Sequence, residues 1–232
     1  MTTTGNNDKT IVKDYFNATG FDRWQRIYGD GEVNKVQADI RVGHQQTIDK
    51  VIAWLKTDQN LNLRSICDAG CGVGSLSIPL AEAGARSIYA SDISEKMAGE
   101  AAVRAEALFG DKPNLVFEAK DLESITGKYN TVICLDVLIH YPREDAAKMI
   151  AHLASLSEDR LILSFAPKTV YLTALKKVGE FFPGPSKTTR AYQHKEVEIR
   201  QMLIDNGFAI ARTEMTSTSF YYSRLIEAVR LR

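Results

Sequence analysis

A glycine-rich run has the residue types and spacing of a small-molecule binding turn: Asp68-Ala69-Gly70-Cys71-Gly72-Val73-Gly74. Its glycines let the backbone turn tightly and approach a ligand without Cβ clashes. A dinucleotide-binding fingerprint would carry its third glycine where this chain has Ser75, and Asp68 would repel a pyrophosphate. S-adenosylmethionine carries an α-ammonium and no phosphate. The run therefore favours S-adenosylmethionine over a nicotinamide dinucleotide, with a ligand-free glycine turn as the alternative for the loop alone.

Acidic residues follow the next two predicted strands, at the sheet edge where open parallel sheets bind ligands. Asp92 can accept hydrogen bonds from ribose hydroxyls. Asp121 can accept one from the exocyclic amine of adenine, and Leu122 can pack on the ring. These residues follow successive strands whose carboxyl ends share one sheet edge with the glycine run. A glycine turn without a ligand is therefore the less favoured interpretation. The expected cofactor contacts are Asp68, Gly70, Gly72, Gly74, Asp92, Asp121 and Leu122.

The fourth predicted strand leads to Asp136 and His140, next to the place where a transferable methyl group should lie. Asp136 is therefore added to the expected cofactor site. His140 is the best candidate for contact with the attacking atom of a methyl acceptor. Its alternative is a histidine that merely hydrogen-bonds to the backbone.

Two further groups could bind the acceptor. Aromatic residues near the N-terminus could cover a flat apolar ligand, although such a stripe is more often part of a core: Phe16, Phe21, Trp24 and Tyr28. Tyr28 precedes a Gly-Asp-Gly turn, which places its hydroxyl within reach of the site. Lys187 and Arg190 lie in a basic loop that could pair with carboxylates, or could simply be solvated.

The elements needed to position these residues follow from the sequence pattern. Residues 8–60 are predicted to be helical, with Asp8 capping the first helix, a break at Thr19-Gly20, and a longer amphipathic helix from Val33 to Leu55. Short β-branched runs then alternate with helical stretches. Strands are expected at 65–67, 87–90, 115–117, 131–135, 161–165, 208–214 and 218–230, and helices at 75–83, 94–109, 143–156, after Phe165 and at 195–205.

This alternation predicts an α/β fold of Rossmann-like type. Its sheet should be mostly parallel with an antiparallel last strand, covered by helices on both faces. Residues 1–61 would form a helical N-terminal arm or lid. Residues 62–232 would form the cofactor-binding domain.

Composition narrows the class of protein. Of the 232 residues, 29 are Lys or Arg and 29 are Asp or Glu, so the formal net charge is +0. The composition therefore shows no excess of positive charge of the kind that binds nucleic acid. Cys67, Cys71 and Cys134 have no zinc-site spacing, and no metal site is expected. No apolar run reaches the length of a membrane span, and no targeting segment is recognised. A cytoplasmic protein is expected, with peripheral contact to a membrane as an option.

Beyond these motifs, nearly the whole chain resembles the magnesium-protoporphyrin IX methyltransferases of chlorophyll biosynthesis, which are Rossmann-like S-adenosylmethionine-dependent enzymes. The segments that carry the resemblance are 14–17, 20–24, 27–29, 68–74, 134–142, 164–169, 182–190 and 220–224. The resemblance implies methyl esterification of one propionate of magnesium-protoporphyrin IX, with S-adenosylhomocysteine as the second product. It also implies a partner, the large subunit of magnesium chelatase, that delivers the porphyrin.

A propionate is ionised at neutral pH, so the implied reaction needs no strong base. We expect His140 and Tyr28 to orient the carboxylate, Trp24 to contact the porphyrin, and Lys187 or Arg190 to hold the other propionate. Two alternatives stay open. One is a methyltransferase for a phenol or quinone, which would need a general base. The other is a non-catalytic cofactor-binding subunit.

Overall fold

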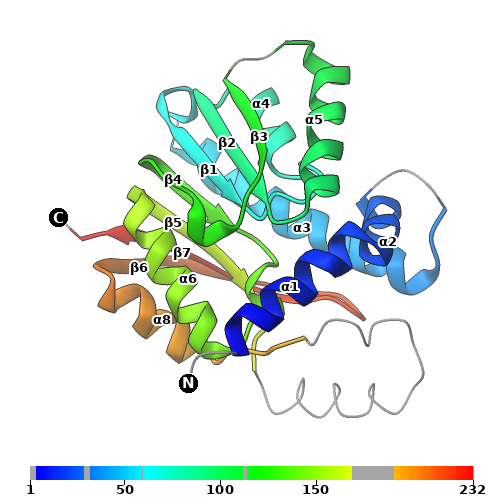
Figure 1. The fold of residues 1–232 in the computed structure, drawn as a ribbon. Coiled ribbons are helices and arrows are strands. Elements are labelled where there is room, and N and C mark those ends of the chain that lie inside the picture. Colours follow the sequence, from blue (N-terminus) through cyan, green and yellow to red (C-terminus); the bar gives the residue numbers. More distant parts are fainter. Residues whose placement is uncertain (1–3, 29–31, 59, 112–113, 169–190, 232) are drawn as a thin grey trace.

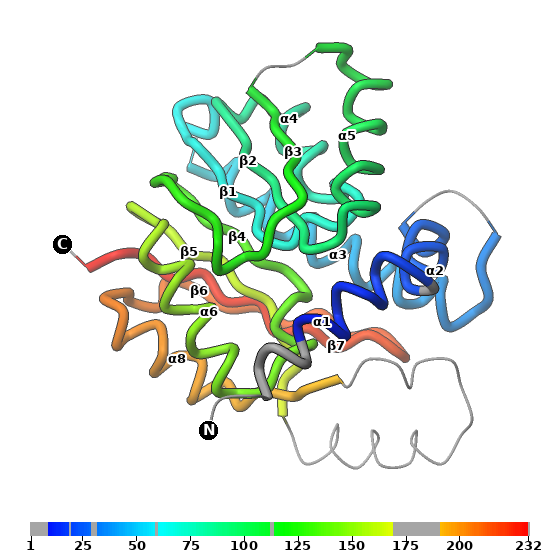
Figure 2. The backbone as a smooth tube through the Cα atoms, in the orientation of Figure 1, coloured from blue at the N-terminus to red at the C-terminus, as the bar shows by residue number. Residues whose placement is uncertain are grey.

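A seven-stranded sheet forms the centre of the protein in a computed structural model that describes residues 4–28, 32–58, 60–111, 114–168 and 191–231 (Figure 1). The strands are β1 (Ser65–Ala69), β2 (Ser87–Asp92), β3 (Leu115–Ala119), β4 (Tyr129–Cys134), β5 (Ser157–Phe165), β6 (Phe208–Ser217) and β7 (Tyr222–Arg230). Their order is β3-β2-β1-β4-β5-β7-β6. Strands β1 to β5 pair in parallel, and β7 lies antiparallel between β5 and β6 (Figure 2). The predicted sheet, with its antiparallel last strand, is confirmed.

Helices cover both faces of this sheet, as predicted. The helices of the described residues are α1 (Thr4–Asn17), α2 (Thr19–Tyr28), α3 (Lys35–Thr57), α4 (Ser77–Glu82), α5 (Glu95–Phe109), α6 (Arg143–Leu156) and α8 (Glu196–Asp205). Short 3-10 helices occur at η1 (Leu61–Leu63), η2 (Leu122–Ser124) and η3 (Leu138–His140). Helices α6 and α8 lie side by side against one face (Figure 1).

Alternating strand residues build a separate apolar cluster on each face, because successive side chains of a strand point in opposite directions. In β4, Val132 and Cys134 pack with residues of α6 and α8, whereas Ile133 packs with residues of α3 and α4. All three side chains are fully buried. Helix α3 adds Ile48 and Leu55 to the second cluster, so it is part of the same core as the sheet.

The N-terminal helices begin at residues other than those predicted. Helix α1 begins at Thr4, so Asp8 lies inside the helix instead of capping it. Helix α3 begins at Lys35 because Asn34 caps it, accepting from the backbone of Gln37 while the Gln37 side chain accepts from the backbone of Asn34. Val33 therefore precedes the helix. A break between the first two helices is present, but it falls at Ala18: α1 ends at Asn17, and the predicted Thr19-Gly20 begin α2.

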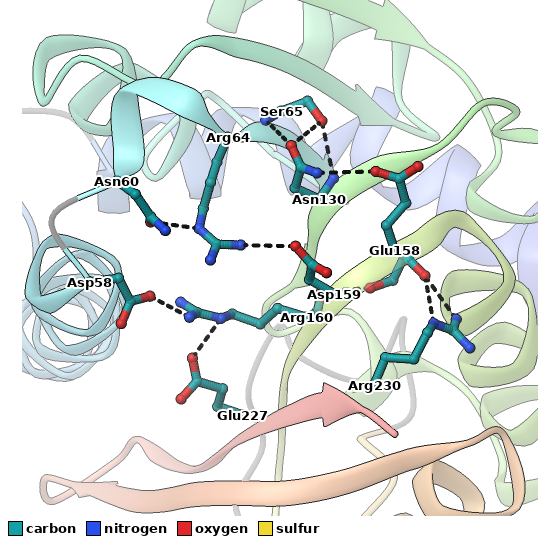
Figure 3. A network of polar contacts seen from close by, with 11 residues as sticks. Asp58, Asn60, Arg64, Ser65, Asn130, Glu158, Asp159, Arg160, Glu227 and Arg230 are labelled. Atoms are coloured by element: carbon teal, nitrogen blue, oxygen red, sulfur yellow. Dashed lines mark hydrogen bonds and ion pairs between the residues drawn. The ribbon is translucent and has the colours of Figure 1, made fainter. Parts of the chain in front are cut away.

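A buried ionic network connects the end of α3 with the sheet (Figure 3). It lies at the sheet edge opposite the carboxyl ends of β1 to β4, which carry the candidate site residues. Arg160 of β5 forms ion pairs with Asp58, which follows α3, and with Glu227 of β7 at 3.0 Å. Glu227 also pairs with Arg212 of β6. The side chains of Arg160 and Glu227 are only 9% and 2% exposed, so their charges depend on these partners.

The helix expected after Phe165 falls mainly on residues 169–190, which lie outside the described part of the chain. None of the described helices combines the length and the apolar character that a membrane crossing requires.

Candidate active site

A cavity of about 260 Å³ opens at the carboxyl ends of β1 to β4, where the sequence placed the site. Its walls come from the glycine-rich loop, the strand ends, α1 to α3 and the β6–β7 turn. Predicted site residues on its wall are Trp24, Tyr28, Gly70, Gly72, Asp92, Asp121, Leu122, Asp136 and His140. One cavity therefore brings together most of the residues selected from the sequence.

The three glycines of the loop differ in what they do. All have positive φ, a conformation that side-chain-bearing residues rarely adopt. A Cβ on Gly72 would meet no atom within 4 Å, so this position offers open space for a ligand. A Cβ on Gly70 would lie 2.1 Å from Val137, and one on Gly74 would press on Ile78 and Ala101 at 3.1 and 3.2 Å. Gly74 thus serves packing and does not line the cavity.

Asp92 sits at the end of β2 with its carboxylate facing the cavity. It accepts hydrogen bonds from the backbone N–H groups of Gly72 at 3.0 Å and Ser94 at 2.9 Å. Burial raises the pKa of Asp92 to about 6, although these two hydrogen bonds act against the rise. Each oxygen keeps a lone pair, which suits the two hydroxyls of a ribose.

Asp68 lies beneath the loop instead of on the cavity wall. The residue is 2% exposed and accepts a 2.5 Å hydrogen bond from the hydroxyl of Ser77. Burial raises the pKa of Asp68 to about 6. Its direct contact with a cofactor stays a prediction, and so does that of Gly74.

Asp121 and Leu122 form the wall at the end of β3. Asp121 accepts from the backbone of Glu123 at 3.0 Å and forms an ion pair with Lys9 of α1 at 3.0 Å. Leu122 is 6% exposed. An apolar side chain beside a carboxylate matches the expected adenine pocket.

Asp136 is the centre of a hydrogen-bond network. One carboxylate oxygen accepts from His44 Nδ1 at 3.0 Å and from the Tyr221 hydroxyl at 2.7 Å. The other accepts from the hydroxyls of Ser164 at 2.8 Å and Ser223 at 3.3 Å. Burial acts to raise the pKa of Asp136, but the hydrogen bonds and the charge of His44 outweigh it, so the pKa is lowered. The site therefore holds an ionised carboxylate, and its contact with a cofactor stays a prediction.

His140 ends η3 and lines the cavity. Its Nδ1 is enclosed and has no hydrogen-bond partner in the described part of the chain. The ring meets Phe16 edge to face at 5.3 Å. Burial lowers the pKa of His140 to about 4, although the charge of Asp136 acts in the other direction. The ring is therefore neutral at pH 7 and keeps an unused polar atom beside the cavity.

Aromatic side chains of α2 close the cavity on the side of the N-terminal arm. Trp24 and Tyr28 stack with centroids 5.3 Å apart, and Tyr28 contacts the His44 ring at 4.4 Å. The indole N–H of Trp24 is also enclosed without a partner among the described residues. Burial, Asp136 and Asp92 raise the pKa of Tyr28, which keeps its hydroxyl protonated. These rings line a cavity wall and are not only core.

Some residues escaped the sequence-based prediction. His44 and Tyr221 were not selected, although both line the cavity and hold Asp136. The available signal for His44 was a polar residue on the apolar face of α3, four positions from Ile40 and from Ile48. The predicted residues Lys187 and Arg190 lie outside the described residues.

The site fits S-adenosylmethionine. Gly72 leaves an open cradle, Asp92 suits a ribose, and Asp121 with Leu122 suits an adenine. Among the described residues, no group of three or more His, Cys, Asp or Glu side chains could hold a metal ion.

Comparisons with known proteins agree with this geometry. A family model described as "Magnesium-protoporphyrin IX methyltransferase C-terminus" matches residues 134–230, and a "Methyltransferase domain" model matches residues 66–159. A magnesium-protoporphyrin O-methyltransferase of Synechocystis is 68% identical over 99% of this chain and 100% of its own length. The chloroplastic magnesium protoporphyrin IX methyltransferase of Arabidopsis thaliana is 55% identical over 97% of this chain and 72% of its own length.

A solved structure agrees as well. The crystal structure of the magnesium protoporphyrin IX methyltransferase of Synechocystis with bound S-adenosylhomocysteine has a TM-score of 0.90 at 67% identity. The match covers 96% of this chain and 100% of that one. With a site built for S-adenosylmethionine and relatives of this identity and coverage, the chain belongs to the magnesium-protoporphyrin O-methyltransferase family.

Proposed function

We propose that this protein transfers a methyl group from S-adenosylmethionine to a propionate carboxylate of magnesium-protoporphyrin IX, giving a monomethyl ester and S-adenosylhomocysteine. Within the site, the proposal rests on the enclosed Nδ1 of His140, which has no hydrogen-bond partner among the described residues. The cavity beside it is lined largely by apolar and aromatic side chains. Such a wall suits a flat macrocycle that brings one polar group to His140.

When bound, S-adenosylmethionine supplies a methyl group on a positively charged sulfur, which a carboxylate oxygen can attack in line. The residues of the chain then have to position the carboxylate and exclude water, because charge is lost as the bond forms. We assign the positioning to His140, which is neutral at pH 7, and to the protonated hydroxyl of Tyr28. Either can donate a hydrogen bond to a carboxylate oxygen.

The pKa values of the same two residues speak against a phenol as the acceptor. A phenol must lose its proton to become a good nucleophile, and a histidine with a pKa of about 4 is a weak base for that task. A carboxylate arrives already ionised. The porphyrin ester is therefore the better match to the chemistry of this cavity.

The lid function expected for residues 1–61 is proposed here for α1 and α2 alone, because α3 shares the core of the sheet. Helix α1 brings Val12 and Phe16 to the cavity, and α2 brings Trp24 and Tyr28. For the second propionate we retain Lys187 and Arg190 as candidates.

We also retain two proposals about the surroundings of the protein. One is delivery of the porphyrin by the large subunit of magnesium chelatase, for which Phe220, 58% exposed at the cavity rim, offers an apolar contact to the incoming ring. Peripheral contact with a photosynthetic membrane is compatible with the chloroplastic location in the name of the Arabidopsis relative.

The test is incubation of the purified chain with methyl-labelled S-adenosylmethionine and magnesium-protoporphyrin IX, followed by chromatography of the porphyrin. We expect labelled monoester from the wild type and much less from His140→Ala, with His152→Ala as the control on α6 outside the cavity. Binding of S-adenosylmethionine without labelled porphyrin or S-adenosylhomocysteine, even with the chelatase subunit added, would favour a non-catalytic subunit.

A further inference from the structure

One face of α3 contacts the turn that joins β6 to β7. Asp39, Gly43 and Thr47 follow one another at intervals of four residues, so they lie on the same side of the helix. Asp39 accepts hydrogen bonds from the turn, a Cβ on Gly43 would lie 2.4 Å from the Tyr221 ring, and the Thr47 hydroxyl lies 3.2 Å from that of Tyr221. The helix thus holds this turn at three successive points along one face.

Asp39 makes the polar attachment at the tip of the turn. One carboxylate oxygen accepts hydrogen bonds from the Thr218 hydroxyl at 2.6 Å and from the backbone N–H of Phe220 at 2.7 Å. The other accepts from the backbone N–H of Ser219 at 3.3 Å. The hydrogen bond from Thr218 is the largest cause of a lowered pKa of Asp39, so the carboxylate is ionised at neutral pH and only accepts. Three successive residues of the turn therefore depend on one side chain of α3.

The turn cannot supply these acceptors itself. The backbone N–H of Thr218 donates to the carbonyl of Tyr221 at 2.9 Å, and the backbone N–H of Tyr221 donates to the Thr218 hydroxyl at 3.2 Å. These two bonds close the turn, whereas the N–H groups of Ser219 and Phe220 find their acceptor on Asp39. Without Asp39 both groups would turn to water, and the backbone at Phe220 would be free to adopt other conformations.

The held segment carries aromatic side chains to the cavity. Phe220, Tyr221 and Tyr222 all line its wall. Tyr221 and Tyr222 are half-buried, but Phe220 is 58% exposed, and within the described ranges it is the one aromatic side chain that is mainly exposed. A large apolar ring that is held in place and still faces water has area left to bury against a ligand.

We propose that Asp39 is a positioning residue for the methyl acceptor: it fixes the β6–β7 turn so that the Phe220 ring lies against the flat face of the porphyrin. Asp39 does not line the cavity, so it acts through the turn. Holding the turn in the free protein reduces the conformational entropy that is lost when the acceptor binds. The assignment rests on the porphyrin acceptor proposed above, and it adds a contact to the macrocycle where His140 and Tyr28 contact the propionate.

The test measures binding of the acceptor without turnover. Magnesium-protoporphyrin IX is titrated into the full chain saturated with S-adenosylhomocysteine, and the quenching of protein fluorescence gives its Kd. Phe220→Ala should raise this Kd about tenfold, and Asp39→Ala should raise it about three- to tenfold. Asp49→Ala removes an exposed acid of the same helix and should leave the Kd unchanged. The affinity for S-adenosylhomocysteine should stay within about twofold of wild type in all three variants, which shows that they are folded.

A double variant tests whether Asp39 acts through Phe220. Asp39→Ala in the Phe220→Ala background should raise the Kd no further, because no ring is left to position. Asp39→Asn keeps the shape and one accepting oxygen, so its Kd should lie between those of wild type and Asp39→Ala. An unchanged Kd in Asp39→Ala, or losses that add in the double variant, would overturn the proposal.

These outcomes are separate from those that test the methyl transfer. Labelled ester from the wild type would support the proposed function even where Asp39→Ala binds the porphyrin normally. Weaker porphyrin binding in Asp39→Ala and Phe220→Ala, together with no labelled ester from the wild type, would support the assignment of Asp39 and contradict the proposed function.

Discussion

Lys9 of α1 forms an ion pair with Asp121 at the adenine end of the cavity, with its Nζ 3.0 Å from the carboxylate, across 112 residues of sequence. Lys9 also pairs with Glu123 on η2. Helix α1 carries Val12 and Phe16 over the cavity. The pair thus joins the covering helix to the wall beneath it, and it should help to hold the cofactor in place.

Lys9→Met should speed the release of S-adenosylhomocysteine. The two side chains are 21% and 32% exposed, so the pair is worth less than about 1 kcal/mol, which corresponds to a roughly two- to fivefold faster dissociation. The effect should shrink at high salt. Stopped-flow fluorescence of Trp24 measures it. Lys13→Met is the control, because Lys13 pairs only loosely with the exposed Glu95 at 3.6 Å. Equal release rates for the two variants would contradict this role for Lys9.

A pair of glycine substitutions separates helix propensity from close packing. Gly99 is exposed in α5 and has open space around it, so Gly99→Ala should stabilise the protein by about 0.5–1 kcal/mol. Gly43→Ala gains the same propensity in α3, but its methyl group would collide with Tyr221. We expect a net loss of about 1–3 kcal/mol in the free energy of unfolding and weaker cofactor binding. Urea unfolding with each variant measures this, and stabilisation by both would contradict the close packing.

The succession of strands and helices could be predicted because each strand has a recognisable pattern within its own few residues. Val132 and Ile133, for example, are β-branched, their side chains are buried on opposite faces of the sheet, and an acid, Asp136, follows soon after the strand ends. Helix starts were harder to predict, because competing caps lie within a few residues. Asp8 had the right residue type, yet α1 begins at Thr4, and Asn34 with Gln37 sets the start of α3.

Some residues of the site could likewise be predicted from the sequence, and others could not. Asp92 and Asp121 could be predicted because parallel strands bring their carboxyl ends to one edge. His44 lies on a helix, 92 residues from Asp136, and Tyr221 lies 85 residues beyond it. No local pattern says which helix face meets which strand end, because tertiary packing decides it. The orientation of Asp136 toward His44 and Tyr221 therefore emerged only from the three-dimensional structure.

The buried ionic network should matter for stability and not for the site. Arg160→Met leaves Asp58 without its partner and leaves Glu227 with Arg212 alone. Removing one member of such a network costs about 3 kcal/mol of the free energy of unfolding. The affinity for S-adenosylhomocysteine should not change, because these residues lie away from the cavity. Arg143→Met removes an exposed pair with Glu198 and should cost less than about 0.5 kcal/mol. Equal losses in the two variants would contradict the importance of burial.

His140 should make the cofactor-free protein less stable at acid pH. Its pKa is about 4 in the folded protein, below the ordinary value of 6.5. Between these pH values the His140 side chain is protonated in the unfolded chain and neutral in the folded chain. The free energy of unfolding therefore falls as the pH drops from about 6.5 to about 4. His140→Gln removes this effect. Relative to wild type, the variant should gain about 1–3 kcal/mol between pH 7.5 and pH 4.5.

Urea unfolding of both proteins at several pH values isolates this contribution. Asp68 and Asp92, with pKa values raised to about 6, act in the opposite direction, because the folded chain holds their protons more tightly than the unfolded chain. Both acids are present in wild type and variant, so their effects cancel in the difference. A difference that stays constant from pH 7.5 to pH 4.5 would show that His140 is protonated as easily in the folded state as in the unfolded one. With the ordinary pKa of 6.5, part of the His140 rings would be cationic near neutral pH, and the neutral hydrogen-bond donor proposed above would no longer describe all of them.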